Sequence, residues 1–300
     1  MAQQRKKNFG RFLVVALAAG LFVSVAPAQT WPDFKRPAPT AADWAALAKL
    51  PDFTGVWEEP LGSANLVVSA AEAKRGHAKT TAGSKFPATS VQPSMPLTPA
   101  WAAKVKYLEA HAAKDNAQAN CVPYGMPTIM TMPYPYEFLL TPGQVTILGE
   151  EERMVRHIYT DGRPLPKDPD PTFWGTSVGH WDGKTLVVES VGFSPQTMMV
   201  STPPVTGSDV VAVPHSNEMK IVERFRLLDP NTMQIETTII DPVALTGPYT
   251  TTRILKRHAN WTLDEYICQQ NNRNFVSGSG EAGVNLTPPA PPVAGGSHDR

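Results

Sequence analysis

Residues 141–193 read TPGQVTILGEEERMVRHIYTDGRPLPKDPDPTFWGTSVGHWDGKTLVVESVGF, and this stretch decides the fold. Four runs in it have the composition of strands, at 144–148, 154–159, 177–181 and 185–191. The last two are joined by Asp182-Gly183, and an Asp-Gly pair between alternating runs is typical of a β-hairpin. The tight turn needs a positive φ, which glycine adopts without strain. We therefore expect paired strands in this part of the chain.

Strand-like runs continue on both sides of this stretch. They lie at 53–57, 128–132, 136–140, 220–228, 233–240, 249–255 and 265–268. In 220–228 the residues alternate, so that Ile221, Glu223 and Phe225 share one face, as in a strand with one buried side. Successive strands without helices between them exclude a doubly wound parallel sheet. We expect a mainly β protein in which neighbouring strands pair antiparallel and about 8–10 of them close into a β-barrel.

The N-terminal third predicts a few short helices. Thr40 is a candidate helix cap, with Asp43 in the first turn and Pro51 as the stop. Thr98-Pro99 starts a second helix, because proline is well suited to the first turn. Residues 60–97 have little strand signal and predict a surface excursion. The predicted organisation is a signal peptide at 1–28, an N-terminal arm with the first strand and a helical excursion at 29–118, the barrel at 119–277 and a disordered tail at 278–300.

A basic start followed by a short apolar run predicts a secretory signal peptide. Ala26-Pro27-Ala28 offers the small residues that signal peptidase needs, so we expect cleavage after Ala28 and a periplasmic or secreted protein. The apolar run is shorter than the roughly 20 residues that span a bilayer, so no stable membrane anchor is expected. Cleavage removes four basic residues, leaving 23 against 27 acidic ones, a net charge of about −4. This balance predicts no nucleic-acid partner.

Cys121 and Cys268 are the two cysteines of the chain. In an oxidising compartment an even count predicts a disulfide bond. The bond would close a loop of about 148 residues and stabilise the protein by about 5 kcal/mol in the chain-entropy model. Two separate buried thiols are the alternative. A catalytic thiol is not indicated, because neither cysteine has an obvious His partner.

Two features resemble known families. Gly55-Val56-Trp57 resembles the Gly-x-Trp signature of lipocalins and their calycin relatives, and the order of helix, Gly-x-Trp strand and hairpin meander is similar as well. This resemblance implies an antiparallel barrel of the calycin or lipocalin kind.

Residues 120–272 resemble a widespread family of uncharacterised exported bacterial proteins. The matching pieces are DGRP at 161–164, GHWDGKTLVVESVGF at 179–193, PHS at 214–216, VERFR at 222–226 and YIC at 266–268, followed by Asn271-Asn272. The sequence departs from the usual pattern at Lys184, where Asp is more common, and at Ser194, where Asn is. The resemblance covers about half of the chain. Because the family has no assigned activity, it implies no catalytic residues.

Two histidines and two carboxylates are candidates for acid–base chemistry. His157 is a general base if its strand face lines a cavity, and otherwise a hydrogen-bonded histidine of the barrel wall. His180 lies just before the Asp-Gly turn and is expected at the barrel rim. Glu189 and Glu223 lie on otherwise apolar strand faces, so each needs a partner or a raised pKa. Each is either an acid–base group or half of a structural ion pair.

Arginines complete this candidate site. The available partners for the two carboxylates are Arg156, Arg163 and Arg253. Arg163 follows a turn and would hold developing negative charge in an enzyme. The candidate ligand-binding residues are Trp174, Trp181, Tyr136, Tyr159, Arg156 and His215.

No metal or cofactor is predicted. His215 and Glu218 would reach a metal together only on a helical turn, and no third ligand is evident. The PHS segment fits better as a cap at a strand entry. The sequence has no Gly-rich phosphate loop, no Gly-x-Ser-x-Gly, no His-Glu-x-x-His and no Cys-x-x-Cys-His, which excludes the nucleotide-dependent, esterase, zinc protease and cytochrome classes that these motifs mark.

These observations predict a periplasmic β-barrel whose interior holds a small apolar or aromatic molecule. A cofactor-free lyase, isomerase or hydrolase acting on a similar molecule is the first alternative, and a structural envelope protein is the second. A His and a carboxylate within about 3 Å of each other in a pocket would favour the enzyme. A filled interior would favour the structural role.

Overall fold

In the computed structural model, the described residues are 34, 36–59, 65–68, 90–93, 95–110, 122–132, 134–201, 212–266, 274–276 and 282–284. They all belong to one compact unit, Phe34–Arg300. The predicted signal peptide, Cys121, Cys268 and the Pro-rich end of the tail lie outside these ranges, so the cleavage and disulfide expectations stay predictions. None of the helices in the described ranges is long and apolar enough to cross a membrane.

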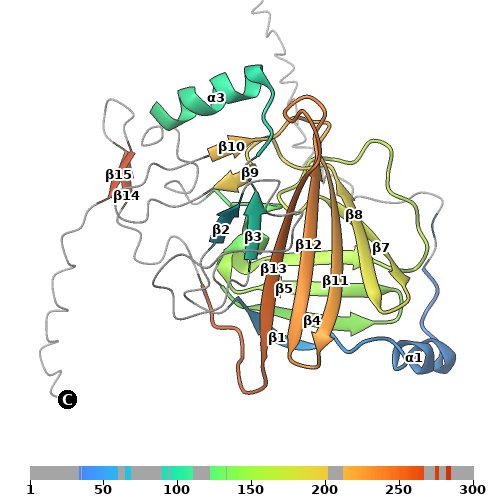
Figure 1. The fold of residues 1–300 in the computed structure, drawn as a ribbon. Coiled ribbons are helices and arrows are strands. Elements are labelled where there is room, and N and C mark those ends of the chain that lie inside the picture. The colour runs from blue at the N-terminus through green and yellow to red at the C-terminus, as the bar shows by residue number, and fades with distance from the viewer. Residues whose placement is uncertain are drawn as a thin grey trace, which may run out of the picture. The chain divides into compact units, whose positions relative to one another are not determined.

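Nine strands close into a barrel (Figure 1). In ring order they are β1 (Gly55–Glu58), β4 (Tyr136–Thr141), β5 (Gln144–Gly149), β6 (Val155–Tyr159), β7 (Thr176–Asp182), β8 (Thr185–Val191), β11 (Lys220–Asp229), β12 (Thr232–Ile240) and β13 (Tyr249–His258). The ring closes at β1, where Val56 lies opposite His258 of β13 and Glu137 of β4. The predicted β-barrel is thereby confirmed.

The barrel is mixed and not purely antiparallel. β6 and β7 are parallel, with Ile158 opposite Ser177, while the other pairs of the ring are antiparallel. A parallel pair needs a connection that carries the chain back along the barrel, and the Pro- and Asp-rich loop between β6 and β7 supplies it. The expectation of antiparallel pairs throughout is therefore wrong at this one place.

Shorter elements surround the ring. β3 (Ser90–Pro93) pairs with β13 and β2 (Asn65–Val68) with β3, while β9 (Met198–Ser201) pairs with β10 (Ala212–Pro214) and β14 (Asn274–Val276) with β15 (Ala282–Val284). The helices are α1 (Ala41–Leu47), α3 (Pro99–Ala110) and the 3-10 turns η2 (Thr128–Thr131) and η3 (Glu151–Arg153). β2 and β3 lie in the predicted excursion, and β15 lies in the range predicted to be disordered.

One strand prediction is wrong, and a second fails over the part of it that the structure describes. In the run 128–132, Thr128–Thr131 form the 3-10 turn η2 and Met132 is its C-cap, because Ile129 N donates to Gly125 O and Met130 N to Pro127 O, which closes local turns. A short apolar run does not distinguish such a turn from a strand. Glu265 and Tyr266, at the start of the other run, are not in a strand.

The predicted Asp-Gly turn and the predicted cap of the first helix are confirmed. Gly183 has φ +59° in the turn that joins β7 to β8. The turn that joins β4 to β5, which was not predicted, has Gly143 at φ +74° after Pro142. These are the positive φ angles that tight hairpin turns require. Thr40 and Asp43 form a reciprocal capping box at the start of α1.

The barrel has two distinct ends. The β4–β5 and β7–β8 turns lie at the end that α1 approaches, which we call the α1 end. The β5–β6 connection with η3 lies at the other, which we call the η3 end. Large side chains fill the interior between the two ends: Trp57, Phe138, Ile147, Ile158, Leu186 and Phe225 are fully buried. This packing differs from the lined hollow that the sequence predicted.

Candidate functional site

A buried charged cluster lies inside the barrel. Arg156 of β6 is 1% exposed and Glu223 of β11 is 0% exposed. The guanidinium donates to both oxygens of Glu223, with Nη1 3.1 Å from Oε1. It also donates to Ser177 Oγ of β7 at 3.3 Å and to Ser190 Oγ of β8 at 3.1 Å. The inward position of Glu223 and its pairing with an arginine are therefore confirmed.

This cluster is fully satisfied. Ser177 and Ser190 share a hydrogen bond of 2.8 Å, and no buried polar side-chain atom of the four residues lacks a partner. A buried ion pair needs such extra hydrogen bonds to offset the loss of hydration. Because the four side chains come from adjacent strands, they brace one wall of the barrel. Arg156 is therefore part of this buried cluster and does not have the ligand-binding role that the sequence predicted.

The predicted histidines lie outside the barrel. His157 is exposed on the outer face of β6, since it neighbours the inward Arg156 and successive strand residues point to opposite faces. His180 is exposed on β7. Neither ring lies on the inner face, where Glu223 is buried, so the expected His–carboxylate pair with Glu223 is not formed.

Glu189 also lies on the outer face. Its side chain is 41% exposed and accepts a 2.9 Å ion pair from Lys220 Nζ, whereas Val188 and Ser190 are fully buried. The expectation that Glu189 points inward is wrong. Leu186, Val187 and Val188 are buried in succession, so alternation alone does not define the inner face of β8.

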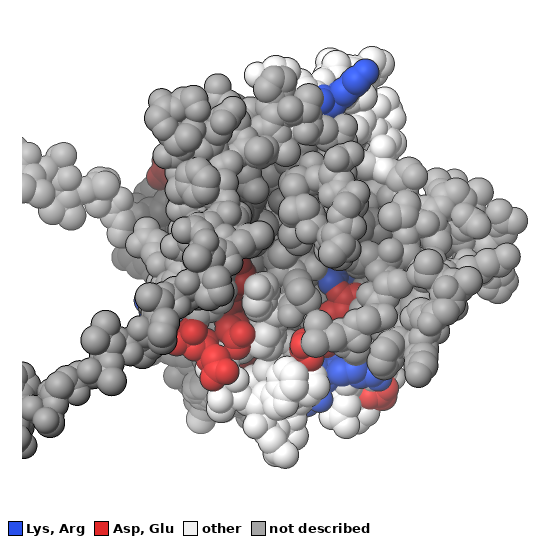
Figure 2. All heavy atoms as spheres, turned by 90° about the vertical axis from the view of Figure 1, so that its left-hand side faces the viewer, with Lys and Arg blue, Asp and Glu red and all other residues white. Residues whose placement is uncertain are grey.

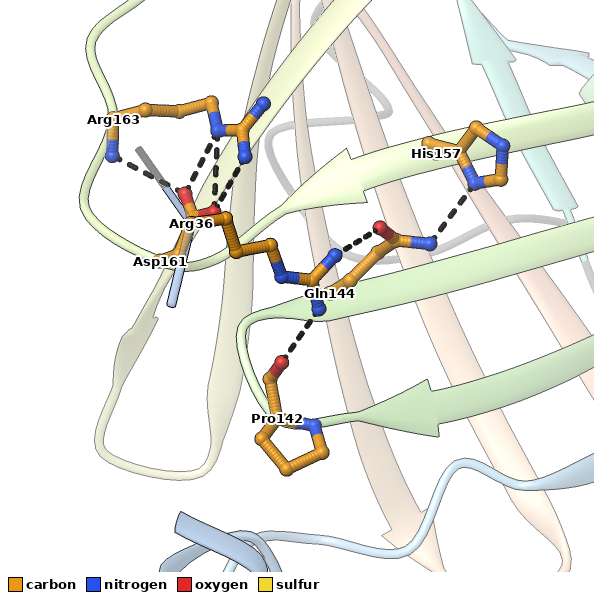
Figure 3. A network of polar contacts seen from close by, with 6 residues as sticks. All are labelled: Arg36, Pro142, Gln144, His157, Asp161 and Arg163. Carbon is orange, nitrogen blue, oxygen red and sulfur yellow. Dashed lines mark hydrogen bonds and ion pairs between the residues drawn. The ribbon is translucent and has the colours of Figure 1, made fainter. Parts of the chain in front are cut away.

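Arg163 and His157 belong to a polar network on the outside of the α1 end (Figure 3). Arg163 pairs with Asp161, with Nη2 2.6 Å from Oδ2, and its guanidinium stacks 3.8 Å from the Tyr159 ring centroid. Arg36 donates to Gln144 Oε1 at 2.7 Å, which orients the Gln144 amide so that Nε2 donates to His157 Nδ1 at 3.0 Å. The network ties the N-terminal arm to the β4–β5 turn.

His215 has a capping role, as the PHS segment predicts. It is buried, with Nδ1 2.7 Å from Ser216 O and Nε2 2.9 Å from both Ser194 O and Thr197 Oγ1. Ser216 in turn donates to the Asp241 carboxylate from its backbone N at 2.7 Å and from Oγ at 2.6 Å. The contacts of His215 hold the entry to β11, so it does not face a ligand.

The predicted ligand-binding aromatic residues are divided between the core and the α1 end. Tyr136 is 1% exposed, and its hydroxyl donates to Ile129 O at 2.5 Å. Trp174 packs against the hydrophobic core. Tyr159 lies under Arg163, and Trp181 borders an open cavity.

That cavity is an open groove of about 250 Å³ at the α1 end. Helix α1 and the residues after it supply Ala46, Leu47 and Leu50 to one side, and the β4–β5 hairpin supplies Pro142 and Val145 to the other. No residue of α1 is buried. The apolar side of the helix is therefore turned to the groove without filling it.

Polar groups mark the rim of the groove. Asp43 lines it, and hydrogen bonds from the Thr40 backbone and hydroxyl lower the pKa of this carboxyl, so it is ionised at neutral pH. Thr141 and Thr160 add two hydroxyl groups. An apolar groove with a few polar groups at its edge is typical of small-molecule sites.

The floor of the groove separates it from the interior. Trp181 packs on Phe53 with ring centroids 5.3 Å apart, and Phe53 is fully buried. The Trp57 indole donates to Phe53 O at 2.9 Å, which fixes this plug at the α1 end of the barrel. A molecule in the groove would therefore contact Trp181 without entering the core.

A second group of ionisable residues, at the η3 end, was missed by the sequence analysis. Burial raises the pKa of Glu151 and of Glu152 to about 7 each, and that of Tyr124 to about 12. Burial also raises the pKa of Tyr134 and Tyr136. The only sequence signal for this group is the charged run Glu150-Glu151-Glu152-Arg153 between two strands. Such a run is equally typical of a solvent-exposed charged turn.

Acidic groups are a feature of this part of the molecule. Figure 2 shows the molecule from the left-hand side of Figure 1. On this face acidic side chains gather in two places, and basic side chains lie beside one of them. Glu58 pairs with His258 Nε2 at 3.3 Å, and buried Glu59 pairs with buried Arg253. Burial lowers the pKa of Arg253 to about 10. Within the described ranges, no three His, Cys, Asp or Glu side chains come together as metal ligands.

Comparison with known proteins adds no identification, since no protein-family model matches the chain and no curated protein is similar to it.

Proposed function

We propose that this β-barrel protein binds a small apolar or aromatic molecule, and that the groove between α1 and the β4–β5 hairpin is the binding site. The observation that carries the proposal is the open groove of about 250 Å³, lined by apolar side chains and bordered by Trp181. The filled interior supports the same choice, because a ligand in the lumen would have to displace buried residues such as Phe138 and Phe225.

The lining sets the chemistry of the ligand. Leu47, Leu50 and Val145 would contact its apolar part, and the Trp181 ring would pack against an aromatic one. The Asp43 carboxylate and the hydroxyl groups at the rim suit a ligand that carries one hydroxyl or amino donor. The volume lies below the roughly 300–1,000 Å³ of drug-sized sites, so a molecule of one or two rings fits best.

The binding test uses indole as the probe, titrated into the full chain and followed by calorimetry. Leu47→Lys places a charge in the groove and should weaken binding by about tenfold or more. Ile240→Lys is the matched control, because Ile240 is an exposed apolar residue at the other end of the barrel. Equal affinities of the two variants would contradict the proposal.

The identity of the natural ligand requires protein from its own host. Native mass spectrometry of that protein should show a co-purifying small molecule that is lost in Leu47→Lys and kept in Ile240→Lys. If no molecule is retained and indole does not bind, the filled barrel would fit a structural envelope protein better.

We also propose that the protein is exported and belongs to the uncharacterised exported family that residues 120–272 resemble. The basic start, the apolar run and Ala26-Pro27-Ala28 support export. The mature protein should begin at Gln29, and intact mass analysis of the exported chain tests this. The same measurement without reductant should find Cys121 and Cys268 joined, and two reactive thiols would contradict the disulfide.

The contacts of the predicted acid–base residues favour the binding proposal over the enzymatic alternative. A general base must lie within about 3 Å of the proton that it removes or reach it through one water. His157, His180 and Glu189 are on the outside of the barrel, while Glu223 is sealed inside it with Arg156. His180 and Glu189 lie on the same outer face of the β7–β8 hairpin, but Glu189 pairs with Lys220. Among the described residues, neither histidine is hydrogen-bonded to Glu189 or Glu223.

A further inference from the structure

Glu151 and Glu152 form a second set of side chains that the groove does not use. They lie in η3, at the opposite end of β5 from the groove. Glu151 is 4% exposed, and its Oε2 is buried without a hydrogen-bond partner. Glu152 Oε2 is buried and unpartnered as well. Because a buried polar atom without a partner costs about 1–3 kcal/mol, two such atoms on neighbouring, electrostatically coupled residues suggest a missing donor.

The backbone holds the Glu152 carboxyl group in place. Glu152 and Arg153 have φ of 59° and 50°, the left-handed region that residues other than glycine adopt only at a cost of about 1–2 kcal/mol each. Tyr124 N donates to Glu152 Oε1 at 2.5 Å, and Gly125 N also bonds to this carboxyl group. The turn therefore pins Glu152 by one oxygen and leaves the other available.

Tyrosine side chains surround the carboxyl groups. The hydroxyl groups of Tyr134 and Tyr266 hydrogen-bond to Glu151, and their rings lie 5.8 Å apart at 52°. Tyr124, Tyr134 and Tyr266 are each partly exposed. The buried Glu151 carboxyl group thus lies against tyrosines that are partly exposed, and the half-buried Glu152 lies next to it in the chain.

The missing donor should be a cation. Two carboxylates in a low-dielectric setting repel each other, and a positive charge between them removes that repulsion. A divalent metal fits poorly, because Ca²⁺ takes about 6–8 oxygen ligands and two carboxyl groups supply few of them. An ammonium group has N–H donors for both free oxygens, and aromatic rings attract its charge and the apolar part that carries it.

We propose that the η3 end binds an organic ammonium ion, held by Glu151 and Glu152, with its apolar or aromatic body against Tyr124, Tyr134 and Tyr266. This site is separate from the groove and does not depend on the proposed function of the groove.

Binding should be linked to proton release. The carboxyl groups, each with a pKa of about 7, are partly protonated at neutral pH, and an ammonium ion favours their ionised form. The titratable groups that act on them are Glu150, Tyr124, Tyr134, Tyr136 and Tyr266. Arg153 is turned to solvent, where it pairs with Glu265. Burial moves the pKa of each of these tyrosines further above neutrality, so affinity should rise between about pH 6 and 8 as Glu151 and Glu152 ionise.

The test titrates phenethylamine into the full chain by calorimetry, with phenethyl alcohol as the uncharged match. Glu151→Gln and Glu152→Gln keep the side-chain shape and remove the charge, and Glu218→Gln, on an exposed loop, is the control. We expect the amine to bind more tightly near pH 8 than near pH 6, with proton release shown by the dependence of the heat on the buffer. Each η3 variant should lose about tenfold or more in affinity while Glu218→Gln keeps it.

Three results would overturn the proposal. The first is equal binding of the amine and the alcohol, and the second is equal affinity of all three Gln variants. The third is binding of calcium in place of the amine. In that case the natural sequence would bind calcium and not phenethylamine, and Glu151→Gln would lose calcium binding. This result would assign the site to a divalent cation. Circular dichroism of each variant checks that it is folded. If Glu151→Gln does not fold, Glu152→Gln still tests the site.

Discussion

The barrel interior and the η3 end both bury carboxyl groups, but they treat them in opposite ways. Inside the barrel, Glu223 has Arg156 and two serines, and no buried polar atom of this cluster lacks a partner. In η3, Glu151 and Glu152 each keep a buried oxygen without a partner. The first arrangement stabilises the wall of the folded barrel, whereas the second leaves two carboxyl oxygens able to accept a hydrogen bond. Burial of a charged group alone therefore does not identify a functional site, and hydrogen-bond satisfaction separates the two cases.

The largest expected effect is in the satisfied cluster. Glu223→Ala should lower the free energy of unfolding by about 3–5 kcal/mol, because it leaves the Arg156 charge buried without its partner. Chemical denaturation measures the loss. Glu236→Ala, on the neighbouring strand β12 and partly exposed, should change stability by less than about 0.5 kcal/mol. A midpoint for Glu223→Ala equal to that of the control would mean that Glu223 is not buried.

At the η3 end, removing a carboxyl group should raise the free energy of unfolding near pH 8 instead of lowering it. A carboxyl pKa that folding raises to about 7 means that the folded state binds more protons, so stability is highest at low pH and falls between about pH 4.5 and 7. Glu151→Gln cannot ionise and should be more stable than the natural sequence near pH 8 by about 1–2 kcal/mol, allowing for solvent screening. The two proteins should be equally stable near pH 4. Destabilisation by Glu151→Gln near pH 8 would contradict the raised pKa.

A smaller loss tests whether every partner in the cluster matters. Ser190→Ala removes one acceptor of Arg156 and the bond to Ser177, and should cost about 1 kcal/mol. Double-mutant cycles with Glu223→Ala should show that the two effects are not additive, since both residues contact Arg156. Additive losses would mean that the serines and the ion pair act independently.

The smallest effect on stability belongs to the groove. Leu47 lies on a helix without buried residues, so Leu47→Lys should change the free energy of unfolding by less than about 0.5 kcal/mol. The same variant should lose indole binding. A large loss of stability would show that α1 is part of the core and that the groove is closed in solution.

Much of the fold was predictable because local chemistry and periodicity agree there. Asp182-Gly183 predicts its hairpin from the φ that the turn requires, and the alternation of Ile221, Glu223 and Phe225 predicts the inner face of β11. The parallel β6–β7 pair was not predictable, because it depends on how a loop without periodicity returns along the barrel. Residues 128–132 were ambiguous, since an apolar run fits either a 3-10 turn or a strand.

The sites were harder to predict than the fold. Glu189 lies beside three consecutive buried residues, so the alternation that correctly placed Glu223 gave the wrong face. Trp181 was a candidate for ligand binding, but its place in the groove depends on α1. This helix is distant from Trp181 in the sequence and lines the same groove. Glu151 and Glu152 have no sequence signal of burial, because the position of their carboxyl groups depends on a turn with positive φ at Glu152 and Arg153 and on tyrosines in other segments.

The central claim is that ligands meet this barrel at its ends while the interior stays closed. The most direct test is a set of ¹H–¹⁵N spectra of the labelled full chain during titration with indole. We expect the signals of Leu47, Val145 and the Trp181 indole to shift and those of Ile147, Leu186 and Phe225 to stay in place. Shifts concentrated on Ile147, Leu186 and Phe225 would show that the interior opens to the ligand, and would contradict the account.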